Sequence, residues 1–312
     1  MSKGKAKGVA AALASALFLG MAPVYGKQAI NLGLPPLGVV ALRTSFAAVL
    51  LLIVICLFRR QYLFIYPAGL LGCFLAGGIN GIGSILYYSA LGRIDASIGQ
   101  LLYSLYPIFV MFWLWLDHQK PSRLTIIRLL MLLPALFLLT TTNHQKIDFL
   151  GVGMMLGASI LYALHLPINQ RVLFDMPAPT VTLYTLLAMS GIVVPAYLIF
   201  GQSIFPAIQV GWGAVVGLTI VTFLSRLTLF LGVKHLGGLQ TALLGLSELL
   251  VTLAFSYLWL GERLSATQWL GALLLVISLS LVIREKAPEN RALDGRLGWV
   301  RGSGVPKDIP LP

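Results

Sequence analysis

Residues 237–263, GGLQTALLGLSELLVTLAFSYLWLGER, decide how the rest of the sequence is interpreted. The apolar run 239–260 is long enough to cross a hydrocarbon core of roughly 30 Å, at about 1.5 Å per helical residue. The run nevertheless carries an acid, Glu248, near its middle. An acid at the centre of a membrane helix costs roughly 2.5 to 3.5 kcal/mol, so we expect Glu248 to face protein or water.

The small and polar residues of this stretch share one helical face. Thr241, Gly245, Glu248, Thr252 and Ser256 follow one another at steps of four, three, four and four. The opposite face consists of Leu, Val and Phe. In water the apolar face of such a helix would be exposed unfavourably. In a bilayer the apolar face can contact lipid while the polar face lines a path through a helical bundle.

Composition gives the same class for the whole chain. Of the 312 residues, 58% are hydrophobic and only 10% are charged, with a mean hydropathy of +0.90. A soluble domain of this size needs more polar surface, so we predict an all-α polytopic membrane protein. The net charge of +12 does not indicate nucleic acid, because the basic residues sit in short runs between apolar segments. Cys56 and Cys73 predict no disulfide framework and no metal site.

Ten apolar segments of about twenty residues follow one another, each bounded by Pro, Gly or charge. They cover residues 9–25, 37–58, 64–88, 98–116, 124–141, 149–168, 181–200, 212–233, 239–260 and 268–283. We interpret the first as an uncleaved helix, because it is long and has a counterpart later in the chain.

The basic residues predict the orientation in the membrane. With the amino terminus inside, sixteen lysines and arginines fall on the cytoplasmic side, Arg171 among them, and four fall on the outside. The positive-inside rule therefore places both termini in the cytoplasm, and we expect a multi-pass protein of the cytoplasmic (inner) membrane. The polar tail, residues 286–312, is predicted to be disordered.

The two halves of the chain repeat. Residues 101–122, LLYSLYPIFVMFWLWLDHQKPS, align with residues 242–265, ALLGLSELLVTLAFSYLWLGERLS, at an offset of 141 to 144. Each half contains an odd number of spans, so the second half must insert upside down relative to the first. We therefore predict ten transmembrane helices in two inverted five-helix repeats, residues 8–145 and 148–285.

Three features carry a resemblance to a known family. They are Arg43 in the second span, YYSALGRIDASIGQLLYSLYPIFV at residues 87–110, and SELLVTLAFSYLWLGERLSATQWLGALLLVISL at residues 247–279. With them the chain resembles the EamA family of the drug/metabolite transporter superfamily over nearly its whole length. The resemblance implies ten helices in two inverted repeats, a central cavity, and outward movement of small metabolites, often amino acids, by alternating access.

Two places depart from the family pattern. The sequence DHQK at residues 117–120 replaces the usual Gly-Glu-Arg of the first repeat, and we expect a weakened loop contact there. Leu249 follows Glu248 where many relatives carry proline, which alters a helix kink.

Polar and aromatic faces of several spans predict one small-molecule cavity. Spans five and ten carry few polar residues and are expected at the periphery. The predicted substrate-binding residues are Arg43, Asn80, Tyr87, Gln100, Tyr103, Tyr106, Tyr162, His165, Arg226 and Glu248.

Several of these residues also have a structural interpretation. Arg43 can tie its helix to neighbouring carbonyls, and Arg226 can form a static ion pair with Glu248. His165 is more typical of an interhelical hydrogen bond than of a proton relay. Small residues four apart, such as Gly77 with Gly81 or Gly153 with Gly157, indicate close helix packing.

The predicted function is secondary transport of a small molecule across the lipid bilayer, without enzymatic activity or a cofactor. GGINGIGS at residues 77–84 lacks a preceding strand and the P-loop lysine, so ATP is not expected as an energy source. In the leading hypothesis Glu248 and Arg226, in preference to Arg43, bind the ammonium and carboxylate of an amino acid or related zwitterion. The alternatives are a cationic drug or amine antiporter coupled to protons, and a passive facilitator or channel. Both a monomer and a homodimer fit the sequence.

Overall fold

The computed structural model describes residues 3–91, 93–94, 102–117, 123–140, 148–201, 212–251 and 266–281. Within these ranges the protein contains helices, turns and loops but no strand. Each of the ten predicted spans overlaps at least one of the α-helices. The α-helices are α1 (Lys3–Asn31), α2 (Pro36–Phe58), α3 (Pro67–Leu91), α5 (Tyr106–Leu116), α6 (Arg123–Thr140), α7 (Phe149–Asp175), α8 (Ala178–Phe200), α9 (Trp212–Leu236), α10 (Gly238–Gly245) and α12 (Ala266–Ser280), and a 3-10 helix, η1 (Arg60–Leu63), follows α2.

The helices begin where the sequence supplies a start signal. Helices α2, α5 and α8 carry proline in the first turn, where its missing N–H costs no hydrogen bond. Helix α7 begins after Asp148, whose carboxylate accepts hydrogen bonds from the N–H groups of Leu150 and Gly151 at 2.9 and 3.2 Å. The hydrogen bond from Gly151, followed by those from Leu150 and Arg93, holds the pKa of Asp148 below its usual value.

The distribution of side chains is that of a membrane protein. Six of the described helices, namely α1, α2, α3, α7, α8 and α9, are long and apolar enough to cross a bilayer. Large apolar side chains such as Phe137 and Phe200 are 63% and 72% exposed, whereas Arg171 and Arg226 are buried. Burial of charge beneath an apolar surface fits lipid as the surrounding medium.

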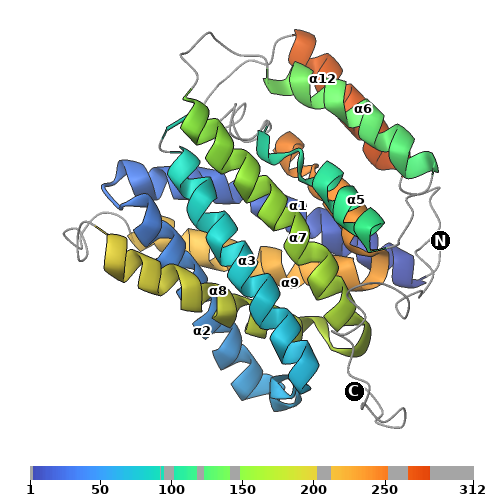
Figure 1. Cartoon of the computed structure of the whole chain (residues 1–312). Helices are drawn as coiled ribbons and strands as arrows, with labels where there is room; N and C mark the ends of the chain where they lie inside the picture. The colour runs from blue at the N-terminus through green and yellow to red at the C-terminus, as the bar shows by residue number, and fades with distance from the viewer. Residues whose placement is uncertain are drawn as a thin grey trace.

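The packing of the helices follows the sequence repeat. Under the repeat, α1 corresponds to α7, α2 to α8 and α3 to α9. Helix α1 packs extensively on α9, and its counterpart α7 packs in the same way on α3. Likewise α2 meets its own counterpart α8. Exchanging the two repeats therefore maps these contacts onto one another, as two similar halves require (Figure 1).

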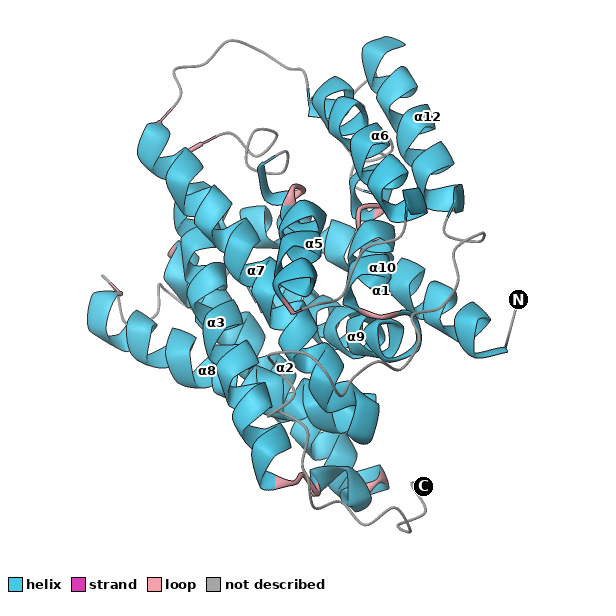
Figure 2. Ribbon diagram, turned by 45° about the vertical axis from the view of Figure 1, so that its right-hand side comes forward, coloured by secondary structure: helices cyan, strands magenta, loops and turns pink. Residues whose placement is uncertain are grey.

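Helices α6 and α12 lie side by side, set apart from the other helices in both views (Figures 1 and 2). Their main packing among the described elements is with each other. The prediction that spans five and ten are peripheral is confirmed.

Two predicted spans are interrupted at equivalent places. Ser104 and Leu105 form a turn just before α5, and Leu246 and Ser247 form a turn just after α10. The turns are 142 positions apart, within the offset of the repeat. Residues 239–260 are thus not one continuous helix as we predicted, because the helix breaks immediately before Glu248. Such broken helices place backbone polar groups and side chains at mid-membrane depth, where transporters form their binding sites.

Helix α7 runs past the end of its predicted span at residue 168 and includes Arg171, which we had placed outside the spans. Arg171 is buried and forms an ion pair with Asp117, at the end of α5. Asp117 therefore makes a buried contact of its own where the sequence had led us to expect a weakened one.

Glycines bring α3 into direct contact with α8. A Cβ atom on Gly77 would lie 2.5 Å from the carbonyl oxygen of Thr185, and one on Gly81 would lie 3.2 Å from that of Met189. The predicted packing role is confirmed for these two glycines. It is wrong for Gly153, whose Cβ would meet no described atom within 4 Å.

Candidate functional site

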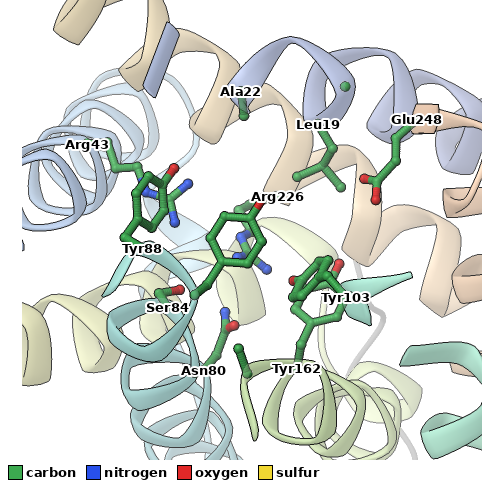
Figure 3. A pocket seen from close by; sticks show the side chains of 14 residues that line it. Leu19, Ala22, Arg43, Asn80, Ser84, Tyr88, Tyr103, Tyr162, Arg226 and Glu248 are labelled. Atoms are coloured by element: carbon green, nitrogen blue, oxygen red, sulfur yellow. The ribbon is translucent and has the colours of Figure 1, made fainter. Parts of the chain in front are cut away.

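A cavity lies between the two repeats, lined by residues of α1, α2, α3, α7 and α9 and by the two interrupted segments. Its volume is about 60 Å³, enough for a few water molecules. Of the ten predicted site residues, seven line it: Arg43, Asn80, Tyr87, Tyr103, Tyr162, Arg226 and Glu248. Figure 3 shows that residues from distant parts of the chain converge on this space.

Arg43 reaches the cavity from α2 and contacts Tyr88 of α3. Its Cζ atom lies 4.8 Å from the centroid of the Tyr88 ring, a cation–π contact visible in Figure 3. The side chain is 8% exposed, and its Nε has no hydrogen-bond partner among the described residues. The carbonyl tie that we considered for Arg43 is therefore not made through Nε.

Arg226 enters the same cavity from α9. Its Cζ lies 5.7 Å from the centroid of the Tyr162 ring, which belongs to α7. Both cavity arginines thus lie over the face of a tyrosine contributed by the neighbouring helix. Such contacts favour a buried guanidinium while leaving room for acceptors in its plane.

Glu248 is positioned by the break in the helix and by close packing against α1. Gly20 of α1 lies so near that a Cβ on it would come within 2.8 Å of the Glu248 carbonyl oxygen. The Glu248 side chain is 6% exposed and lines the cavity beside Leu19 (Figure 3). The prediction that Glu248 faces protein or water, and not lipid, is confirmed.

A run of tyrosine rings forms one wall. Tyr103 lies with its ring centroid 4.8 Å from that of Tyr87 and 5.3 Å from that of Tyr162. Tyr106 packs behind them, 5.0 Å from Tyr162 in an edge-on arrangement. The wall can offer apolar area, hydroxyl groups and ring faces to a ligand.

Two predicted site residues lie behind the wall rather than on it. Tyr106 is buried, and its hydroxyl donates to the Ala242 carbonyl at 2.9 Å, so it joins the two interrupted segments. His165 is fully buried, and its Nδ1–H donates to the carbonyl of Tyr162, one turn earlier in the same helix. This hydrogen bond is within α7 and not between helices. Gln100, the remaining predicted residue, lies outside the described residues.

The cavity also contains residues that the sequence did not suggest. Leu19, Gly20 and Ala22 come from α1, in which no charged or aromatic stripe drew attention. Tyr88 is not among the predicted site residues, although it lines the cavity together with its neighbour Tyr87. Tyr87 and Tyr88 lie at a similar depth in their span as Arg43 does in the adjacent span. This similarity in depth could have predicted the contact with Arg43.

Comparison with known proteins agrees with this arrangement. A solved crystal structure with 17% sequence identity superposes with a TM-score of 0.73, covering 91% of this chain and 96% of the other, which shows the fold alone. No curated protein matches the chain. The EamA-like transporter family matches twice, over residues 6–141 and 149–284, which are the two predicted repeats to within a few residues. The chain is an integral multi-pass membrane protein and a member of the EamA-like transporter family.

Proposed function

We propose that the protein is a secondary transporter that exports an amino acid or a related zwitterion across the cytoplasmic membrane by alternating access. The observation that carries the proposal is the presence of opposite charges, Arg226 and Glu248, on the wall of one cavity between two repeats. Arg226 would bind the carboxylate of the substrate and Glu248 its ammonium group. The ring faces of Tyr103 and Tyr162 would contact the rest of the molecule.

The packing around the cavity supports a conformation closed on one side. Tyr106, Leu166, Phe230 and Leu246 are all buried in one apolar cluster formed by α5, α7, α9 and the break after α10. In the predicted orientation this cluster lies on the cytoplasmic side. A cavity of about 60 Å³ is too small for most amino acids, so binding requires it to widen. Rocking of the two similar halves about their contacts would open each side in turn.

The lining of the cavity argues against a cationic amine as substrate. Two arginines lie on its wall against one described acid. Repulsion between like charges at low dielectric would oppose entry of a cation. A passive facilitator would need the same cavity. It would differ from a proton-coupled transporter only because its transport is not coupled to protons.

The test is flux in proteoliposomes containing the purified full chain. We expect saturable, counterflow-capable amino-acid transport that falls about tenfold or more in Glu248→Gln and Arg226→Ala. Arg60→Ala, at an exposed arginine outside the cavity, should transport normally. Unchanged flux in both cavity variants would remove the proposed binding roles, and unsaturable conductance would indicate a channel. A pH gradient imposed at clamped membrane potential separates proton coupling from facilitation.

A further inference from the structure

We infer that the substrate of this cavity carries two anionic groups and one cationic group, as an acidic amino acid does, and so has a net charge of −1. The inference rests on the proposed function. It narrows the substrate from zwitterions in general to those with an excess of negative charge.

The described side chains that line the cavity carry more positive than negative charge. Among the described residues that line it, the side chains charged at neutral pH are Arg43, Arg226 and Glu248, so the lining has a formal charge of +1. None of the three is more than 8% exposed. Uncompensated charge is costly in such surroundings. A ligand of zero net charge would leave the excess in place, whereas a ligand of charge −1 would neutralise it.

The Nε atom of Arg43 distinguishes a substrate contact from a structural tie. An arginine that only fastened α2 to its neighbours would be expected to donate its Nε–H to a carbonyl, yet that atom is buried and has no hydrogen-bond partner in the described part of the chain. The face of the Tyr88 ring attracts the guanidinium electrostatically, but it provides no lone pair to accept a hydrogen bond from the N–H groups. Arg43 is therefore equipped to receive a carboxylate, for which a guanidinium offers two parallel donors.

The two arginines would bind different groups. Arg43 comes from α2 of the first repeat and Arg226 from α9 of the second, each stacked on its own tyrosine. Glu248 completes a set of two positive groups and one negative group on the wall. An α-amino acid with a second carboxylate has the complementary set of two negative groups and one positive group. Its α-carboxylate would bind only one of the arginines, which leaves the other arginine for the second carboxylate.

A net negative substrate also explains how export could proceed without protons. An inside-negative potential drives an anion outward, and 100 mV corresponds to a concentration ratio of roughly 50-fold for one charge. The side of the membrane on which the substrate accumulates would then be set by the potential alone.

Three small probes test the inference with the full chain in proteoliposomes. L-aspartate carries two carboxylates and an ammonium group, L-asparagine lacks the second carboxylate, and succinate lacks the ammonium group. We expect the kcat/KM for aspartate in counterflow to exceed that for each of the others about tenfold or more. A potassium diffusion potential set with valinomycin, negative inside, should accelerate aspartate efflux and slow its uptake.

Arg43→Gln should remove the preference for aspartate over asparagine. The matched control is Arg60→Gln at an exposed arginine outside the cavity, which should keep the preference. Elution of each variant as a single species in detergent establishes that it is folded. Retention of the full preference in folded Arg43→Gln would overturn the inference.

The remaining outcomes separate the inference from the proposed function. If asparagine or other neutral amino acids move as well as aspartate, or if succinate does, the substrate class is wrong while a transporter remains. If neither these probes nor a panel of neutral and basic amino acids shows saturable flux, the proposed function fails, and the inference fails with it.

Discussion

The Nη2 atom of Arg171 lies 2.5 Å from the Oδ2 atom of Asp117, and the two side chains are 2% and 3% exposed. Asp117 follows the last residue of α5 and Arg171 lies in the last turns of α7, so the pair joins the first repeat to the second. Charge-assisted hydrogen bonds of this kind are strong, but their value depends on both members being present.

Removal of one member should therefore destabilise the protein more than removal of both. Arg171→Met leaves the Asp117 carboxylate buried without this partner, and we expect a loss of about 3 to 5 kcal/mol. The double variant Asp117→Leu/Arg171→Met should recover most of that loss. The apparent melting temperature in detergent measures both effects, with Arg60→Met at an exposed site as the control. Equal melting temperatures for the single variant and the wild type would show that the pair adds nothing to stability.

The burial of this ion pair could not be predicted from the local sequence. The apolar part of the sixth span stops near residue 168, and hydropathy alone places the polar residues after it in a loop. They are buried because α7 continues to Asp175 and packs against α5 and α9. Burial by distant helices leaves no periodic signal in the local sequence.

Tyr106 and Gly245 form a second testable pair. A Cβ on Gly245 would lie 2.5 Å from the Tyr106 hydroxyl oxygen but 3.8 Å from its Cζ. Gly245→Ala should therefore displace Tyr106 and cost about 1 to 3 kcal/mol. Tyr106→Phe removes both the colliding oxygen and the hydrogen bond to Ala242, for about 1 kcal/mol. The double variant should be no less stable than Tyr106→Phe alone, which thermal unfolding of all four proteins can check. Additive losses would contradict this geometry.

Close packing of α3 on α8 predicts a difference between two glycines. Alanine at Gly77 would place its Cβ 2.5 Å from the Thr185 carbonyl oxygen, a backbone atom that cannot move aside easily. We expect Gly77→Ala to lower stability by about 1 to 3 kcal/mol. Gly153→Ala is the matched control in α7, where no described atom lies within 4 Å, and it should be neutral or stabilising. The same melting temperature for both variants would mean that α3 and α8 do not meet at Gly77.

The sequence predicted the helical segments and most of the charged and aromatic cavity residues because both leave strong local signals. Apolar runs mark the spans, and Glu248, Arg226 and Arg43 stand out because a charge inside such a run is costly. The contribution of Leu19, Gly20 and Ala22 left no such signal. Small apolar residues are ordinary in a membrane helix, and only the three-dimensional approach of α1 to Glu248 shows why they line the cavity.

The start of α7 should respond to acid. The Asp148 carboxylate accepts hydrogen bonds from Gly151 and Leu150, which hold its pKa below the usual value. Because the pKa is lower in the folded state, the stabilisation is present at neutral pH and is lost as the pH falls below about 3.8 through the folded pKa. Asp148→Ala should speed hydrogen exchange at Leu150 and Gly151 at pH 7, whereas Asp148→Ser should preserve much of the cap. Equal exchange in the alanine variant would show that the cap does not hold this turn.

Gly20 offers a test of the position of Glu248 that leaves its chemistry unchanged. A Cβ at residue 20 would lie 2.8 Å from the Glu248 carbonyl oxygen and 2.9 Å from the Cβ of Val251, so Gly20→Ala must push the segment after the helix break away from α1. Misplacement of a binding group by a fraction of an ångström weakens charge-assisted contacts, and we expect transport to fall about tenfold although the acid is still present. Gly213→Ala, with no described atom within 4 Å, controls for the substitution itself. Counterflow of the transported amino acid in both variants is the measurement. Wild-type transport in Gly20→Ala would mean that substrate binding does not depend on the position of Glu248. The acid would then contribute to helix packing and not to substrate binding.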